Sequence, residues 1–221
     1  VPQAGAPTHG NILAALDRLA NEVKAGDFVY LHFSGHGSRQ PSRGGKKSPE
    51  PDGLDEIFLP RDIGKWDGGI ATVENALIDS EMDQAILRMR TRGAFVWAVF
   101  DSCHSATMTR GAQPDEIRYR QVLPDALGIP EKAIESAARD APGTRGQAQA
   151  EKVAGAMGKV GGDGDEKTLG GLVAFYAAQT VEPTPDLPLP AGKEGRKSHG
   201  LFTYTLAEAL VHPARAGKEH E

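Results

Sequence analysis

The spacing of apolar residues along the chain predicts three buried strands. Each is a short run rich in aromatic and β-branched residues, and the runs cover residues 28–33, 94–100 and 171–178. The second run is apolar on both faces, which is typical of a central strand in a parallel sheet. Residues 56–59 would add a short edge strand within a stretch, residues 38–76, that otherwise has the glycine and proline content of a loop.

Helical segments are predicted before and between these strands. They cover residues 11–24, 79–92, 131–140 and 201–211, with Thr8 or Asn11 as the N-cap of the first. Because helices alternate with strands, we expect an α/β fold with a mostly parallel central sheet covered on both faces. Ligands of such a sheet bind at the carboxyl ends of its strands.

Two polar clusters follow two of these strands directly. The first is Ser34-Gly35-His36-Gly37 and the second is Asp101-Ser102-Cys103-His104-Ser105. If the strands are parallel neighbours, His36 and Cys103 lie at the same edge of the sheet, where an imidazole can promote a thiolate and protonate a leaving amine. The backbone N–H groups of Gly37 and Cys103 are suited to bind an oxyanion. The pair therefore indicates nucleophilic catalysis by a cysteine.

Each cluster also has a purely structural interpretation. A turn with a hydrogen-bonded histidine would explain the first cluster, and a strand-to-helix turn capped by Asp101 or Ser102 would explain the second. His32 lies four positions before His36, but about 13 Å away along a strand, so we expect it to pack rather than to share a metal. Both clusters together, each directly after an apolar strand, favour catalysis.

Composition and charge narrow the classes of function. A chain of 221 residues fits one α/β domain with a long insertion, and its single cysteine excludes an intrachain disulfide and a cysteine-rich zinc site. The formal net charge is −5 without a basic, aromatic-interleaved patch, so we expect no nucleic-acid partner. No apolar stretch is long enough to span a bilayer, so we expect no membrane partner and a cytoplasmic location.

Five segments resemble the caspase/metacaspase superfamily, and specifically its bacterial metacaspase-like members. They are residues 30–38, 52–62, 77–81, 100–105 and 200–206. The resemblance implies a caspase-like three-layer α/β/α sandwich and a cysteine endopeptidase that acts through a dyad of His36 and Cys103. It makes Asp101 the acid at the floor of the S1 pocket, so that arginine and then lysine are preferred at P1 in protein or peptide substrates. The alternative is that Asp101 does not bind substrate and instead caps the amino terminus of a helix.

The resemblance also implies how the chain is divided. Residues 1–221 would form one peptidase domain, with a large-subunit-like part at 1–105, a flexible processing insert at 106–170 and a small-subunit-like part at 171–221. Exposed flexible loops are where proteases cut. The insert offers several basic residues for such processing: Arg110, Arg118, Arg120, Arg139, Arg145 and Lys152.

Departures from the family pattern limit these expectations. Only ten residues precede Asn11, so the family's first strand has no counterpart, and an N-terminal fragment or a second chain would complete the sheet. Asp79 matches a calcium ligand of relatives, but Ser80 and Arg110 stand where acids are expected, so calcium is disfavoured and no cofactor is expected. The alternative function is a catalytically silent caspase-like interaction or scaffold module.

Two further groups of polar residues leave alternatives open. The acids Asp52, Asp55, Glu56 and Asp62 would bind a cation, line the cleft or belong to a solvated loop. Residues 198–200 would line the substrate cleft, as they do in relatives, or cap the last helix.

Overall fold

The computed structural model of the protein describes residues 5–43, 50, 52–103, 118–141, 169–177 and 184–212. The helices are α1 (His9–Glu22), α2 (Asp79–Thr91), α3 (Glu131–Asp140) and α5 (Leu201–Val211), with a 3₁₀ helix η3 (Pro124–Leu127). The strands of the central sheet are β1 (Phe28–Ser34), β7 (Phe95–Asp101) and β9 (Leu172–Tyr176). Within the described ranges, the three central strands and the helices other than η3 agree with the sequence-based predictions to within a few residues.

The central sheet has the strand order β1-β7-β9, and both pairs are parallel. β1 and β7 are in register from Phe28 opposite Phe95 to Ser34 opposite Asp101, so the two strands end side by side. The expected α/β fold with a parallel sheet is therefore confirmed, and both polar clusters begin at the same edge.

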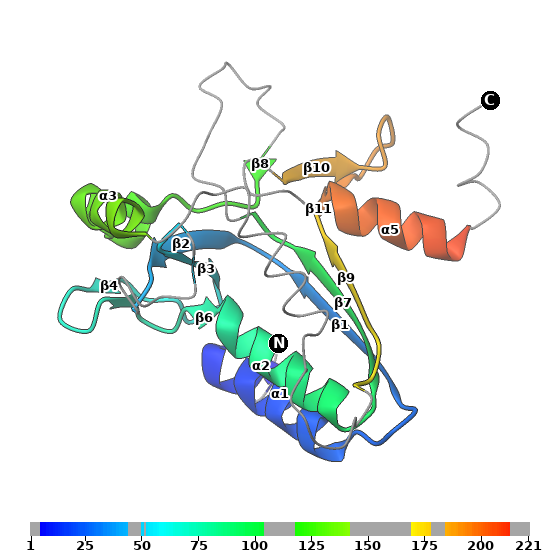
Figure 1. Ribbon diagram of the computed structural model, residues 1–221. Coiled ribbons are helices and arrows are strands. Elements are labelled where there is room, and N and C mark those ends of the chain that lie inside the picture. Colours follow the sequence, from blue (N-terminus) through cyan, green and yellow to red (C-terminus); the bar gives the residue numbers. More distant parts are fainter. Residues whose placement is uncertain are drawn as a thin grey trace.

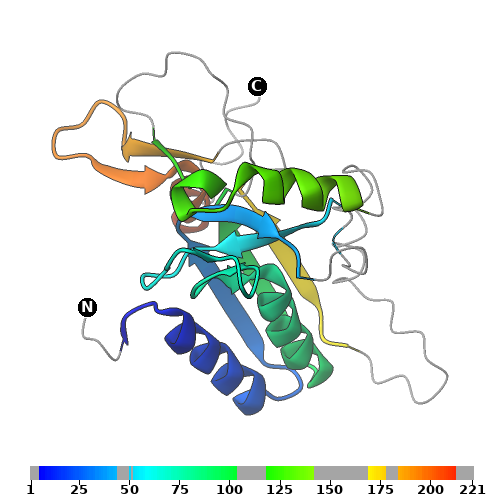
Figure 2. The same ribbon diagram turned by 90° about the vertical axis from the view of Figure 1, so that its left-hand side faces the viewer.

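Helices α1 and α2 run side by side along one face of this sheet (Figures 1 and 2). The apolar side chains of α1 and α2 that face the sheet recur every three or four residues, so they form one face of each helix. They contact every second residue of β1 and β7, because successive strand residues point to opposite faces of the sheet. The buried core between them includes Leu16, Met89, Leu31, Val96 and Ala98. Thr8 caps α1, since its hydroxyl accepts a hydrogen bond from Asn11 N at 3.3 Å.

The opposite face of the sheet carries aromatic and apolar side chains. Trp97 contacts the rings of Tyr30 and Phe175, with centroids 5.2 and 5.6 Å apart. Among the described residues, α5 covers only the carboxyl end of this face, where Thr203 contacts His32. The third layer is thus short, and the rest of the face leaves several side chains exposed: Phe28, Tyr30, Phe95, Val173 and Phe175.

A second sheet lies within the stretch that was expected to be mostly loop. It has the order β2-β3-β6, from β2 (Gly37–Pro41), β3 (Leu54–Phe58) and β6 (Leu77–Ile78), beside a hairpin of β4 (Trp66–Asp67) and β5 (Thr72–Val73). β3 is therefore its central strand rather than an edge strand. The buried Gln40 joins the sheet to the hairpin, because its side-chain oxygen accepts the N–H of Val73 at 2.8 Å.

A third sheet joins segments that are far apart in the sequence. Its order is β11-β10-β8, all antiparallel, from β8 (Arg118–Tyr119), β10 (Pro185–Leu189) and β11 (Lys197–Gly200). The prolines around residues 182–190 predict a loop, but residues 185–189 form β10. The expectation of a flexible insert at 106–170 is also wrong for residues 118–141, which include β8, η3 and α3.

Residues 198–200 belong to β11, and Gly200 is the N-cap residue of α5. No side chain among them caps that helix, and their place along the substrate cleft stays a prediction. Within the described ranges, no helix has the length and apolar character needed to cross a membrane.

Candidate functional site

The carboxyl ends of β1 and β7 position the two predicted catalytic residues. Ser34 pairs with Asp101, and Gly35 N extends the ladder by donating to Asp101 O at 3.1 Å. His36 and Cys103 each follow two positions after this matched pair, so the sheet places them on adjacent strand ends. The side chain of His36 is exposed, whereas Cys103 is 1% exposed.

The two predicted oxyanion donors point at the same atom. Gly37 N and Cys103 N both donate to the carbonyl oxygen of Arg120, each at 3.1 Å. Gly37 begins β2 and Cys103 follows β7, so two separate segments supply donors that converge beside the cysteine. Converging N–H groups of this kind suit an oxygen that gains negative charge.

Asp101 is completely buried beside the start of α5. Its Oδ2 accepts hydrogen bonds from the backbone N–H of Thr203, at 3.1 Å, and from the Thr203 hydroxyl. Asp101 therefore caps the first turn of α5 from outside that helix, where the helix dipole favours a negative charge. Its Oδ1 is buried and has no hydrogen-bond partner among the described residues, although buried carboxylates are normally fully paired.

The guanidinium of Arg120 lies in the space beside Asp101. Nη1 is 2.5 Å from Ser34 Oγ, 3.3 Å from Asp101 O and 3.7 Å from Asp101 Oδ2. Nη2 lies 3.5 Å from Asp186 Oδ1, so a second carboxylate, from β10, shares the charge. The Arg120 side chain packs directly against the backbone of Gly200, at the end of β11. A Cβ added to Gly200 would lie 2.6 Å from both Nε and Cζ of Arg120.

His32 belongs to a hydrogen-bonded chain that ends at Asp101. Tyr30 Oη lies 3.3 Å from Nδ1, and Nε2 lies 3.0 Å from Thr203 Oγ1. Since the Thr203 hydroxyl donates its own proton to Asp101, Nε2 of His32 must donate to Thr203 Oγ1. Desolvation lowers the pKa of His32, against a smaller raising effect of Asp101, so the neutral ring is favoured, and in that ring Nδ1 accepts from the Tyr30 hydroxyl. The expected packing role of His32 thus includes hydrogen bonding.

The other acids that the sequence singled out lie in local contacts. Arg39, itself 4% exposed, lies 3.4 Å from Asp52 and 3.8 Å from Glu56. Asp62 accepts the N–H of His9 at 2.8 Å. Within the described ranges, no group of three or more histidine, cysteine or acidic side chains is arranged to hold a metal ion. Asp79 Oδ1 accepts the N–H of Ser80 at 2.8 Å at the start of α2.

Several residues of this site carried no sequence signal of their own. Asp186 lies in a proline-rich segment, and Thr203 lies inside a predicted helix. Arg120 had been noted only as one of six basic residues in the insert. Of the other residues discussed above, several lie outside the described residues: His104, Ser105, Arg110, Arg145 and Lys152.

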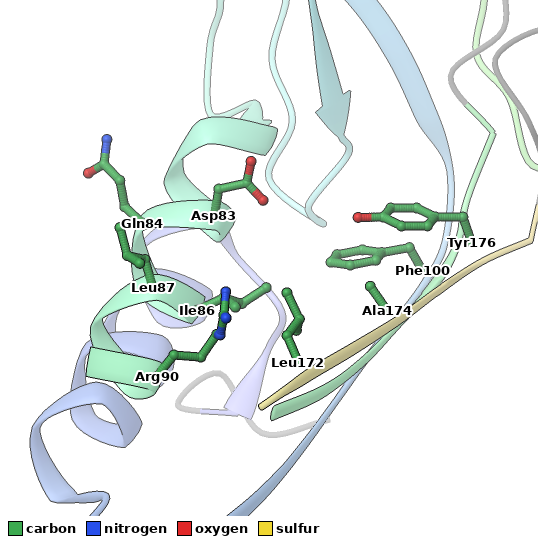
Figure 3. A pocket seen from close by; sticks show the side chains of 9 residues that line it. All are labelled: Asp83, Gln84, Ile86, Leu87, Arg90, Phe100, Leu172, Ala174 and Tyr176. Carbon is green, nitrogen blue, oxygen red and sulfur yellow. The ribbon is translucent and has the colours of Figure 1, made fainter. Parts of the chain in front are cut away.

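A separate apolar pocket of about 200 Å³ lies between α2 and the edge of the central sheet. Figure 3 shows Ile86 of α2 pointing toward Leu172, with the rings of Phe100 and Tyr176 on the sheet side of the pocket. The pocket is on the α2 face of the sheet, whereas Ser34 and Asp101 contact groups on the α5 face. None of the predicted site residues lines it.

The amino-terminal half of the chain matches known proteins. The family described as metacaspase, peptidase C14 domain, matches residues 2–111. Metacaspase-1B of Aspergillus fumigatus is 37% identical over 101 residues, which are 46% of this chain and 22% of that protein. Metacaspase-1 of Cryptococcus neoformans var. neoformans is also 37% identical over 101 residues, covering 46% of this chain and 20% of that protein. The match thus spans about a fifth of these relatives' length.

The fold also has a counterpart among solved structures. The crystal structure of protein GSU0716 from Geobacter sulfurreducens matches with a TM-score of 0.53 and 22% sequence identity. The match covers 94% of this chain and 63% of that one. At this identity the two proteins share a fold, and their chemistry has to be argued from the residues.

Proposed function

The chain belongs to the caspase/metacaspase superfamily, and on that premise we propose that it is a cysteine endopeptidase acting on protein or peptide substrates. Cys103 is the nucleophile, and His36 takes its proton and later delivers a proton to the leaving amine. The sulfur adds to the carbonyl carbon of the scissile bond, the amine leaves, and water hydrolyses the resulting thioester.

One observation carries this proposal. Gly37 N and Cys103 N converge on a single carbonyl oxygen, and they come from the residues next to His36 and from the nucleophile itself. The carbonyl oxygen of a substrate bound at the same place would become negatively charged in the tetrahedral intermediate, and the two preorganised N–H groups would stabilise that charge. A turn that only joins a strand to a loop has no need for two such donors at one point.

The proposed P1 preference is arginine, followed by lysine. A buried carboxylate with an unpaired Oδ1, together with Asp186, gives the space beside Asp101 a negative character. A guanidinium can hydrogen-bond to several acceptors at once, whereas an ammonium acts as a point charge. An aspartate at P1 would be repelled there.

The dyad is tested with fluorogenic peptides and with an alkylating inhibitor. Cys103→Ala should abolish hydrolysis of a P1-Arg peptide, and His36→Ala should lower kcat by about 100-fold or more, while both variants melt like the wild type. A chloromethyl ketone with arginine at P1 should alkylate Cys103 only in the wild type. A folded wild type that neither hydrolyses peptides nor reacts would instead support a silent interaction module.

The S1 assignment is tested with Asp101→Ala. Loss of one partner of a desolvated ion pair costs roughly 2–5 kcal/mol, so kcat/KM for P1-Arg peptides should fall about 30-fold or more. Reaction of Cys103 with iodoacetamide, which does not use the S1 pocket, should change far less. An unchanged P1 profile in Asp101→Ala would contradict the assignment.

A further inference from the structure

We propose that Thr203 and His32 are positioning residues for P1 recognition: Thr203 fixes the orientation of the Asp101 carboxylate, and His32 fixes the hydroxyl of Thr203. This inference rests on the proposed function, because both residues act on a substrate only through Asp101. The sequence alone predicts packing for His32 and a place inside a helix for Thr203.

Thr203 donates two hydrogen bonds to one oxygen of Asp101. Its backbone N–H lies 3.1 Å from Oδ2, and its hydroxyl donates to the same atom. The other oxygen, Oδ1, is buried and has no hydrogen-bond partner among the described residues. A buried carboxylate that is held through one oxygen keeps its orientation only while those bonds persist. Thr203 therefore determines where the negative charge of Asp101 lies.

His32 fixes the direction of the Thr203 hydroxyl. Its Nε2 lies 3.0 Å from Thr203 Oγ1, and Tyr30 Oη lies 3.3 Å from Nδ1 of the same ring. A threonine hydroxyl has one proton and rotates to suit its neighbours. Because Nε2–H already points at Oγ1, the hydroxyl proton turns toward Asp101. The donors of the chain Tyr30–His32–Thr203 thus all point toward the carboxylate, and hydrogen bonds arranged in this way strengthen one another.

The oxygen that Thr203 holds is also the one that faces the proposed P1 site. Nη1 of Arg120 lies 3.7 Å from Asp101 Oδ2, and this guanidinium stands in for the cation of a P1 side chain. Gly200 keeps that side open, because a Cβ added to it would collide with Oδ2. A charge-assisted hydrogen bond depends on a short distance, so the hold on Oδ2 sets how well a P1 cation is bound.

These contacts give Asp101 two compatible roles. Thr203 lies in the first turn of α5, where the helix dipole favours the negative charge of a cap. The same cap places Oδ2 beside the P1 site. A purely structural role would only tie α5 to the central sheet, so it predicts variants that melt earlier but bind P1 residues normally. Positioning predicts a loss confined to reactions that use S1.

The test compares Thr203→Val, which keeps the shape and the backbone N–H, with Thr203→Ser, which keeps the hydroxyl. Thr203→Val should lower kcat/KM for P1-Arg and P1-Lys peptides about tenfold or more, mainly through a higher KM, because a hydrogen bond to a charged group is lost. Thr203→Ser should stay within about threefold of the wild type. Alkylation of Cys103 by iodoacetamide should be unchanged in both. Thr205→Val makes the same change at an exposed position of the same helix and should behave like the wild type.

A double variant tests whether His32 acts through Thr203. His32→Leu removes the donor at an exposed position, and it should lower kcat/KM for P1-Arg peptides about threefold. In Thr203→Val protein the same change should add no further loss, because the hydroxyl that His32 orients is already gone. Losses that add in the double variant would contradict the chain from His32 to Asp101.

The outcomes separate this inference from the proposed function. If Asp101→Ala loses P1-Arg hydrolysis but folded Thr203→Val matches the wild type, positioning is wrong and the peptidase stands. An equal loss of iodoacetamide reactivity in Thr203→Val would show a general disturbance of the site and would also overturn positioning. If the wild type hydrolyses no peptide, the proposed function fails and the positioning role fails with it.

Discussion

At the scale of single residues, the site depends on groups that no local motif identifies. His36, Cys103 and Asp101 follow from polar clusters at strand ends, and the structure brings them to one edge. Asp186 and Thr203 come from segments more than 80 positions after Asp101, and only the fold puts Thr203 beside Asp101 and Asp186 beside Arg120. Sequence patterns record local spacing, so contacts across such distances could not be predicted from them.

Gly200 gives a prediction about the shape of the arginine site. Its φ of −60° suits any residue, so Gly200→Ala adds a methyl group beside Arg120 and Asp101 without straining the backbone. We expect kcat/KM for P1-Arg peptides to fall about tenfold or more, corresponding to at least ~1.4 kcal/mol, with little change in alkylation by iodoacetamide. Gly10→Ala is the control, because no atom lies within 4 Å of its added Cβ. Equal losses in both variants would contradict a local steric effect.

His32 gives a prediction about pH. Its pKa is lowered by desolvation, so as the pH falls below the ordinary value of about 6.5 the unfolded chain takes up a proton before the folded one. The His32 contribution to stability is therefore present above about pH 6.5 and declines as the pH falls toward the lowered value. His32→Gln should reduce the difference in urea midpoint between pH 8 and pH 5.5. An unchanged difference would show that His32 does not titrate in this way.

At the scale of elements, strong periodicity predicted the helices and the parallel strands, whereas antiparallel pairings were missed. β10 contains Pro185 and Pro188, and prolines argue against a strand in the middle of a sheet because they lack an N–H. β10 is nevertheless central between β11 and β8. The β2-β3-β6 sheet was hidden for a related reason, since its strands lie among glycines and prolines and are stabilised by long-range pairing.

The start of α2 gives a prediction about calcium. Asp79 Oδ1 accepts the N–H of Ser80, and Ser80 lacks the carboxylate expected of a calcium ligand. Peptide hydrolysis should therefore keep its rate within about twofold when EGTA replaces added calcium. A requirement for millimolar calcium would show that other acids, such as Asp52 or Asp55, complete a site.

At the scale of the whole molecule, the sheets connect parts of the chain on either side of the insert at residues 106–170. β9 pairs with β7 from Val96 opposite Leu172 to Phe100 opposite Tyr176, and α5 contacts Asp101 through Thr203. The division into large-subunit-like part, insert and small-subunit-like part stays a prediction, as does a further strand beside β1. Phe28 and Tyr30 of β1 are exposed on the α5 face of the sheet, and a further strand beside β1 would enlarge that face.

These connections give a prediction about protein that is processed in the insert. The two fragments of a chain cut once after a basic residue of the insert should elute together from a sizing column at the volume of uncut Cys103→Ala protein, because the β7–β9 ladder and the contacts of α5 survive the cut. They should separate only in denaturant. Early separation in plain buffer would show that the covalent link between the two parts is required.

The carbonyl of Arg120 between its two donors has a kinetic consequence for every external substrate. The segment that carries Arg120 belongs to the same chain as the nucleophile, so it competes with each incoming substrate as a tethered ligand. A short tether holds such a ligand at an effective concentration in the millimolar range. If its intrinsic dissociation constant is about 0.1 mM, the apparent KM of external substrates rises roughly tenfold. Inhibition constants measured on the wild type would rise by the same factor, whereas Arg120→Ala would report the intrinsic values.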